Sequence, residues 1–251
     1  MILRQFLYPD TACASYLFGC LSYNRLAVVD PHAELVDRYV EAAEAIGSPI
    51  VAVFETHVQA DHVSGLPGLV AATGATSYLP AGARVGFAHH ALEDGERVEL
   101  GNTIVTTMAT PGHAPAHHAY VVADLRRETD DPWLVFTGDS LLVNDAGRPD
   151  LHAAGGDPHA LAVQQHASMQ RLLTLPDHVV VLPSHYGGSV CGRGLSGNPI
   201  SSIGFERRHN RALQHLDADE FADELLRDLP PAPTDQARIV AANRAAFGAT
   251  T

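Results

Sequence analysis

The chain has 251 residues, 46% of them apolar, and a formal net charge of −13, which predicts one domain spanning residues 1–251 with a substantial core. The negative charge argues against binding to nucleic acids or anionic membranes. The chain has no apolar run of ~20 residues that could span a membrane. Because its start does not resemble a secretory signal and its three cysteines suggest no disulfide framework, a cytoplasmic protein is expected.

Alternating and apolar runs predict the first elements. Residues 14–20 and 26–31 are expected to form strands of a first sheet. Residues 33–46 place apolar side chains at helical spacing, and Gly47 favours a helix end. Residues 50–56 are almost continuously apolar, which predicts a strand buried on both faces.

The middle of the chain continues with shorter segments. Residues 63–73 are predicted to be helical and residues 76–80 to form a strand. The polar, glycine-containing stretch 81–101 is expected to be a loop with an edge strand. Residues 102–111 and 117–124 alternate well enough to predict two neighbouring strands.

The last third alternates strands with helices. Strands are expected over 132–139 and 178–185, separated by a helix over 158–174 that begins with Pro158. From about residue 199 onward the chain is predicted to form helices at 199–214, 217–228 and 235–247.

Strand-rich segments followed by helices therefore occur twice along the chain. Two sheets packed face to face, with helices on both outer surfaces, would bury every apolar face. This pattern predicts the α+β class.

Short polar patches follow several of these apolar strands. They read THVQADHVSG at 56–65, TPGHAPAH at 110–117, FTGDSLL at 136–142 and LPSHYGG at 182–188. Two imidazoles and one carboxylate, from His57, His113 and Asp139, are the ligand types of non-haem Fe(II) sites that leave positions open for oxygen and substrate. We predict these three residues as metal ligands.

The same patches contain four further candidates. Asp61, His62 and His185 either bind a second metal or hydrogen-bond to the first ligands and orient them. Gln59 offers only a neutral amide, which is a poor ligand for zinc, and is expected to hydrogen-bond a metal-bound water. We assign catalytic roles to Asp61, His62, His185 and Gln59.

The order of these segments resembles the metallo-β-lactamase superfamily. That superfamily usually opens its metal site with His-x-His-x-Asp-His, and here Gln59 replaces the middle histidine. The resemblance implies a four-layer αββα sandwich with the metal at one edge between the sheets. Because Gln59 replaces one of that superfamily's zinc ligands, a hydrolytic centre with two zinc ions is in doubt here.

A narrower resemblance is to the persulfide dioxygenases. It is carried by LRQFLYPDTACASYLFG near the start, by ETHVQADHVSG, and by FTGDSLLVNDAGRPDLH, which contains Gly147, Arg148 and Asp150 in a Gly-Arg-x-Asp pattern. Residues 187–210 are similar to the lactamase-like domain of dioxygenase–rhodanese fusion proteins.

This resemblance implies one Fe(II) per chain, held by His57, His113 and Asp139. The implied reaction oxidises a thiol persulfide, such as glutathione persulfide, with O2 to sulfite and thiol. In the family the histidine at the position of Gln59 is not an iron ligand, so its replacement by glutamine leaves the implied set of iron ligands complete. A single iron favours an orienting role for the second set of candidates. The resemblance is also consistent with assembly as a homodimer.

Two alternatives remain open. A zinc-dependent hydrolase of a thioester or lactone, similar to glyoxalase II, is kept open by the intact Asp61, His62 and His185. A binding or regulatory protein that has lost its chemistry is the other alternative, and the nearly complete ligand set argues against it.

Arginines suggest where an anionic substrate binds. Arg148 and Asp150 form either an ion pair that shapes the pocket or a surface turn. A basic cluster suits an anionic thiol carrier such as glutathione or coenzyme A, or is a solvated helix face. This cluster contains Arg193, Arg207, Arg208 and Arg211. The predicted substrate-binding residues are Arg148, Asp150, Arg193 and Tyr186.

The remaining histidines and the cysteines are expected to be structural. We expect surface positions, or positions supporting the ligands, for His89, His90, His117, His118, His152, His159, His166, His178, His209 and His215. Cys13, Cys20 and Cys191 are expected to be small buried or half-buried residues, because their spacing matches no zinc motif.

Overall fold

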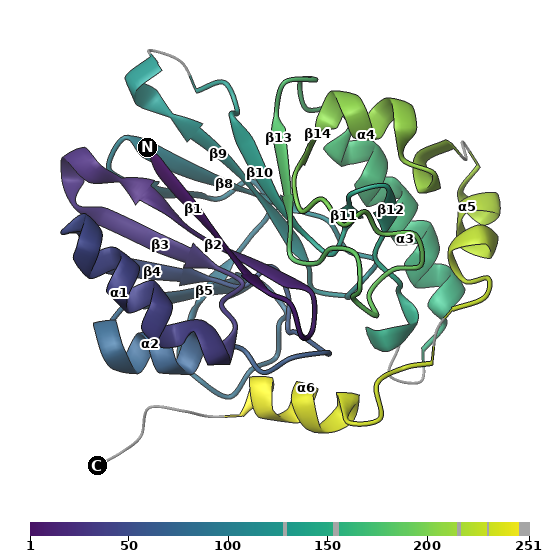
Figure 1. Ribbon diagram of the computed structural model, residues 1–251. Coiled ribbons are helices and arrows are strands. Elements are labelled where there is room, and N and C mark those ends of the chain that lie inside the picture. Colours follow the sequence, from purple (N-terminus) through teal and green to yellow (C-terminus); the bar gives the residue numbers. More distant parts are fainter. Residues whose placement is uncertain (128–129, 153–155, 215–216, 230, 246–251) are drawn as a thin grey trace.

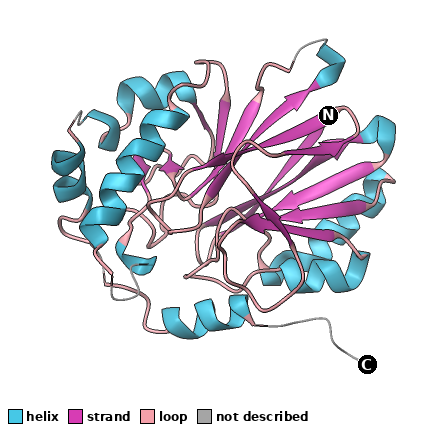
Figure 2. Ribbon diagram, turned by 180° about the vertical axis from the view of Figure 1, so that it is seen from behind, coloured by secondary structure: helices cyan, strands magenta, loops and turns pink. Residues whose placement is uncertain are grey.

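Two six-stranded sheets pack face to face, and helices cover both outer surfaces (Figure 1; Figure 2). The computed structural model describes residues 1–127, 130–152, 156–214, 217–229 and 231–245. The predicted four-layer αββα sandwich is confirmed.

The first sheet is built from the N-terminal part of the chain, and two helices lie on its outer face (Figure 1). Its strand order is β1 (Ile2–Tyr8), β2 (Cys13–Cys20), β3 (Arg25–Val29), β4 (Ile50–Phe54), β5 (Thr76–Pro80) and β6 (His90–Leu92). The helices are α1 (Val36–Ile46) and α2 (Leu66–Thr73). Gly47 ends α1 at φ 74°, as the sequence predicts.

The second sheet is built from the C-terminal part and is covered by further helices (Figure 1). Its order is β14 (Ser201–Ser202), β13 (Val180–Pro183), β10 (Leu134–Gly138), β9 (His118–Asp124), β8 (Thr103–Ala109) and β7 (Arg97–Leu100). A small hairpin joins β11 (Leu141–Leu142) and β12 (Asp145–Ala146). The later helices are α3 (Pro158–Leu172), α4 (Ile203–His209), α5 (Ala218–Leu225) and α6 (Gln236–Arg244).

Side-chain alternation in β2 explains why two apolar layers form. Tyr16 and Phe18 point into the space between the sheets, where their ring centroids lie 5.1 Å and 4.9 Å from that of Phe136 in β10. Leu17 points the other way and packs with Tyr39 of α1. Both faces of this strand are therefore buried, as is typical of a central strand in a layered fold.

Three parts of the chain depart from the sequence expectations. Residues 2–8 form the edge strand β1, which was not predicted because its burial is only partial. Residues 81–101 contain two strands, β6 and β7, rather than one. The helix predicted over 199–214 is shorter: β14 comes first, and α4 begins only after Ser202, whose hydroxyl accepts from Phe205 N–H.

The C-terminal helix α6 returns to the edge at which the sheets' loops gather (Figure 1). Asn243 near its end donates to the carbonyl oxygens of Gln59 and His62, at 3.0 Å and 2.9 Å. The predicted helices over 217–228 and 235–247 correspond to α5 and α6, and residues 246–247 lie outside the described part. Among the described helices, none has the length and apolar character needed to traverse a bilayer.

Candidate metal centre

Polar side chains from both sheets meet at one edge of the sandwich. The chain leaves β4, β10 and β13 and reaches His57, Asp139 and His185 within a few residues. A hydrogen bond of 2.9 Å from His118 N–H to the carbonyl oxygen of Thr56 joins the two sheets there. The fold therefore brings together residues that lie far apart in the sequence.

Three imidazoles form the first cluster at this edge. The ligand atoms of His57, His113 and His152 all lie within 4.8 Å of one another. His57 is fixed through Nδ1, which lies 3.0 Å from Thr56 Oγ1, so its Nε2 is left available. The sequence predicts two of these histidines as ligands, and the structure adds His152.

Asp139 lies between this cluster and a second one. Its Oδ2 is 3.5 Å from His113 Nε2, and its Oδ1 is 2.7 Å from His185 Nδ1. Asp139 also forms a candidate ligand group with His185 and Cys191. This carboxylate is thus placed to interact with both clusters.

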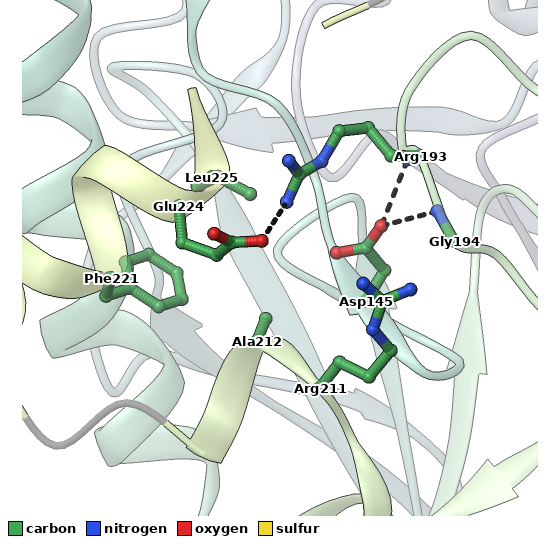
Figure 3. Close-up of a pocket in the computed structure, with 8 residues that line it drawn as sticks. All are labelled: Asp145, Arg193, Gly194, Arg211, Ala212, Phe221, Glu224 and Leu225. Atoms are coloured by element: carbon green, nitrogen blue, oxygen red, sulfur yellow. Dashed lines mark hydrogen bonds and ion pairs between the residues drawn. The ribbon is translucent and has the colours of Figure 1, made fainter. Parts of the chain in front are cut away.

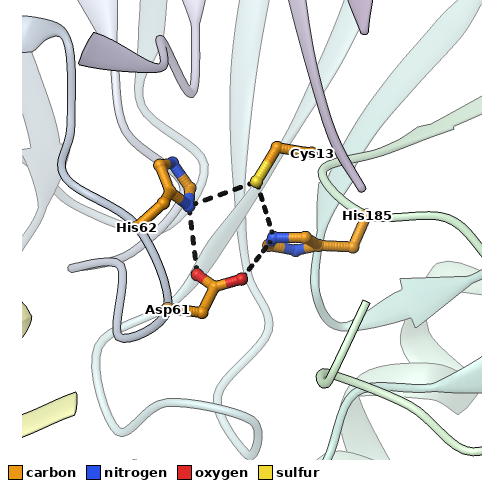
Figure 4. Close-up of side chains that lie close together, drawn as sticks. All are labelled: Cys13, Asp61, His62 and His185. Atoms are coloured by element: carbon orange, nitrogen blue, oxygen red, sulfur yellow. Dashed lines mark hydrogen bonds and ion pairs between the residues drawn. The ribbon is translucent and has the colours of Figure 1, made fainter. Parts of the chain in front are cut away.

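The second cluster contains the other predicted residues and one unexpected thiol (Figure 4). Asp61 bridges two imidazoles, with Oδ1 at 3.0 Å from His62 Nδ1 and Oδ2 at 2.7 Å from His185 Nε2. The Cys13 thiol lies 3.4 Å from His62 Nδ1 and 3.3 Å from His185 Nε2. Cys13 is buried, as expected, but its surroundings are polar.

The two clusters differ in protonation. Burial first, and then neighbouring imidazoles such as His113, hold the pKa of His57 well below its usual value. Burial also lowers the pKa of His113, and it lowers that of His152 to about 3. These three imidazoles are neutral at physiological pH, which is the form that binds a metal.

The second cluster holds charge instead. Burial opposes the charged forms, but Asp139 and Asp61 keep the pKa of His185 well above its usual value. His185 and His62 in turn hold the pKa of Asp61 well below its usual value despite burial. The same two imidazoles lower the pKa of the buried Cys13 to about 7. The result is a network of charged hydrogen-bonding partners.

The first cluster fits a transition-metal ion. Asp139 Oδ2 and His152 Nε2 are buried and have no hydrogen-bond partner in the described part of the chain. Buried polar atoms of this kind are normally satisfied, and a coordinated cation would satisfy them. Imidazole nitrogen and carboxylate oxygen are donors suited to Fe(II) and to zinc.

Gln59 belongs to neither cluster. Its side chain is buried and lines a small cavity together with Glu55 and Ser64. The position at which a second histidine would stand in the first motif therefore contributes no candidate ligand. His152 supplies the additional imidazole from a segment that lies far from Gln59 in the sequence.

Asp30 is a supporting residue that the sequence analysis missed. Its carboxylate accepts from Thr56 N–H at 2.7 Å and from the hydroxyls of Thr56 and Ser184. Burial raises its pKa, although these hydrogen bonds favour the charged form. Because Thr56 precedes His57 and Ser184 precedes His185, Asp30 fixes one residue of each cluster. Its only sequence signal is its place at the end of a predicted strand.

Other side chains position the candidate ligands through hydrogen bonds to the backbone. Gln165 of α3 accepts from His113 N–H at 2.5 Å and donates to the carbonyl oxygen of Ser140 at 2.6 Å. His117 Nε2 accepts from Asp139 N–H at 3.2 Å. His117 thus has one of the supporting positions that the sequence leads us to expect.

Two residues of the clusters were not singled out by sequence reasoning. His152 follows the Gly-Arg-x-Asp pattern by two residues, and this proximity is the one signal that could have identified it. Cys13 opens β2, and no spacing connects it with the histidines. Of the histidines expected at the surface or behind the ligands, His215 lies outside the described residues.

Gly147 allows the chain to pass directly behind the ligands. A Cβ atom added there would collide with the carbonyl oxygen of Asp139 and would lie 2.9 Å from His113 Nδ1. We expect Gly147→Ala to lower the free energy of unfolding by about 1–3 kcal/mol and to weaken metal binding, as measured by denaturation and by metal titration. Gly197→Ala is the control, because apart from the two neighbouring residues no described atom lies within 4 Å of its added Cβ. Equal behaviour of the two variants would contradict this account.

Arg148 and Asp150 form a close pair. The guanidinium donates to the two carboxylate oxygens at 2.8 Å and 2.7 Å, and the Arg148 side chain is only 2% exposed. The ion-pair interpretation therefore describes this segment better than a solvated surface turn. Asp150 and His152 belong to one short 3-10 turn, so the pair also sets the position of His152.

The other predicted substrate-binding residues, Arg193 and Tyr186, do not belong to the imidazole cluster. Arg193 lines a separate cavity of about 200 Å³ with Asp145 and Arg211, and its guanidinium lies 3.6 Å from Glu224 (Figure 3). Arg207 and Arg208 pair with Asp177. Tyr186 packs against the core between the sheets. The basic cluster predicted from the sequence is thus largely engaged in ion pairs.

Comparisons with known proteins agree with this architecture. The metallo-beta-lactamase superfamily model matches residues 9–185. The chain is similar to the mitochondrial persulfide dioxygenase ETHE1 of Bos taurus, at 27% identity over 228 residues that cover 88% of this chain and 79% of the relative. The crystal structure of ETHE1 from Myxococcus xanthus superposes with a TM-score of 0.83 at 31% identity, covering 97% of this chain and 98% of that one.

A second group of relatives are hydrolases. A hydroxyacylglutathione hydrolase of Pseudomonas entomophila is 35% identical over 162 residues, which cover 64% of this chain and 57% of the relative. The family model spans the segments that carry His57, His113, Asp139 and His185. This chain belongs to the metallo-beta-lactamase superfamily.

Proposed function

We propose that this protein is a non-haem iron persulfide dioxygenase. The reaction would be R–S–SH + O2 + H2O → R–SH + sulfite + 2 H⁺, with a thiol persulfide such as glutathione persulfide as substrate. The observation that carries the proposal is a cluster of neutral buried imidazoles beside a carboxylate, one oxygen of which has no hydrogen-bond partner in the described part of the chain. Similarity to persulfide dioxygenases over most of the chain supports it.

His57, His113 and Asp139 would hold the iron, one ion per chain, and His152 would be available as a further imidazole ligand. The bound iron would supply electron transfer between O2 and the persulfide sulfur. The protein's own residues would orient the reactants and control protons. Because Asp139 and Asp61 keep the pKa of His185 well above its usual value, His185 would retain a proton beside the reacting sulfur.

The roles of the other predicted residues follow from their positions. Asp61 and His62 would orient His185 through hydrogen bonds. Gln59 would shape the pocket near His57. The proposed compartment is the cytoplasm, which agrees with three free cysteines, and assembly as a homodimer is part of the same proposal.

A zinc-dependent hydrolase of thioesters or lactones is the second candidate. The intact cluster of Asp61, His62 and His185 and the similarity to hydroxyacylglutathione hydrolases favour it. Zinc would lower the pKa of a bound water and so generate hydroxide for attack on a carbonyl carbon.

Metal analysis of anaerobically purified protein, followed by oxygen uptake with glutathione persulfide, distinguishes the two. About one iron per chain with sulfite release is the result expected for the dioxygenase. Zinc at one or two ions per chain, hydrolysis of a thioester and no oxygen uptake would reject it in favour of the hydrolase.

A further inference from the structure

We propose that an open cavity beside His152 binds the anionic part of the thiol carrier through Arg84 and Arg244. This inference rests on the proposed function, because it assumes that a persulfide reacts at the adjoining imidazoles. The cavity has a volume of about 500 Å³, which lies within the range of pockets for small molecules.

The cavity leads directly to the imidazole cluster. Val58 and Ala114 line it, and these residues follow His57 and His113 in the sequence. His152 lines it as well and shares the three-imidazole cluster with those two histidines. A ligand in the cavity would therefore extend a sulfur atom toward the cluster past His152.

The charge of the lining selects anions. Arg84 and Arg244 carry the charged side chains, and the neutral His152 is joined by alanine, glycine, proline and valine. Both arginines are exposed, and neither forms an ion pair with any residue the structure describes. In a chain with a net charge of −13, two unpaired guanidinium groups on one cavity wall form a local site for carboxylate or phosphate.

The backbone holds the two arginines in place. Gly86 N–H donates to the carbonyl oxygen of Arg244 at 2.8 Å, which ties the segment after Arg84 to the end of α6. Asn243 fixes the same end of α6 to the metal-binding loop: it donates to His62 O, and its Oδ1 accepts from Ser64 N–H at 2.9 Å. The backbone positions from which the two guanidinium groups extend are therefore set before a ligand arrives, which favours binding.

The chemical class of ligand follows from these features. It is a thiol whose carrier bears carboxylate or phosphate groups several bonds from the sulfur. Glutathione supplies carboxylates and coenzyme A supplies phosphates, and both would meet the same guanidinium groups. Arg193, Arg207 and Arg208 are unsuited to this role because their partners are acidic side chains of the protein itself.

The test compares Arg84→Ala, Arg244→Ala and the double variant with wild type in steady-state oxygen uptake. We expect KM for glutathione persulfide to rise about tenfold in each single variant, as for the loss of one charged hydrogen bond. The preference for this substrate over the persulfide of 2-mercaptoethanol, whose carrier has no carboxylate or phosphate, should fall by the same factor. Arg97→Ala is the control, since Arg97 is exposed on β7 and pairs only with Asp130 among the described residues.

Coenzyme A persulfide forms the second arm of the test. A larger rise in KM for coenzyme A persulfide than for glutathione persulfide indicates that the arginines bind phosphate. A larger rise for glutathione persulfide indicates that they bind carboxylate. Unchanged KM for both substrates in the double variant would overturn the inference.

Calorimetric measurement of glutathione and coenzyme A binding tests the cavity independently of the proposed function. If wild type consumes no oxygen with any persulfide, the proposed function fails. Binding that is lost in the double variant then still supports the cavity, and binding that persists or was never present rejects it.

Discussion

Replacing His113 with alanine should remove both the iron and the oxygen uptake that we propose for this protein. His113 shares the imidazole cluster with His57 and His152, and its Nε2 lies 3.5 Å from Asp139 Oδ2, which has no hydrogen-bond partner among the described residues. Loss of a residue that merely supports a ligand typically costs 10–100-fold in metal affinity, so loss of a ligand should cost at least as much. Iron content after anaerobic purification and oxygen uptake with glutathione persulfide are the two measurements.

His90→Ala is the matched control. His90 is another imidazole, but it lies on the surface and pairs with Glu96 at 2.6 Å. It should retain the iron content and turnover of wild type. Normal iron content in the His113 variant would place the metal elsewhere, and persistent turnover in a metal-free variant would reject the iron mechanism.

The layers of the fold could be predicted because their elements have clear periodicity. The apolar run at 50–56 became the buried strand β4, and the helical spacing at 158–174 became α3. The edge strand β1 was missed because partly exposed strands lack a strong apolar pattern. The helix expected at 199–214 was too long because local propensity does not reveal the pairing of Ser201 and Ser202 with β13.

The candidate site could be predicted where its residues follow strands. His57, Asp139 and His185 come directly after apolar runs, and strand ends at one edge of a layered fold meet in space. Cys13 and His152 could not be predicted in the same way. Their proximity to the clusters depends on how β2 and the turn after Arg148 pack, which is a tertiary property.

The arginines also show that tertiary contacts cannot be predicted from neighbouring positions in the sequence. Sequence proximity grouped Arg193 with Arg207 and Arg208, and the structure pairs them with Glu224 and Asp177. Arg84 and Arg244, which have no ion-pair partner among the described residues, come from two distant segments that only the fold brings to one cavity. A charged cluster in a sequence therefore identifies charge, whereas the availability of that charge to a ligand depends on its partners.

Replacing Asp30 with alanine should destabilise the protein and weaken metal binding together. Asp30 accepts from the backbone and hydroxyl of Thr56 and from the hydroxyl of Ser184, all of them buried. Their loss leaves buried donors unpaired, at a cost of about 3 kcal/mol in the free energy of unfolding. Because these donors precede His57 and His185, metal affinity should also fall about tenfold.

Glu206→Ala separates these two effects. Glu206 is an equally buried carboxylate that accepts from Asn144 N–H at 2.9 Å and from Asn210 at 2.7 Å, and it belongs to neither metal-binding cluster. Its loss should lower stability by a similar amount while the affinity for Fe(II) remains that of wild type. Denaturant unfolding and anaerobic iron titration of both variants measure the two quantities. An Asp30 variant that loses stability but keeps full affinity for Fe(II) would contradict this role. It would show that packing between the sheets is sufficient to position the ligands without the Asp30 carboxylate.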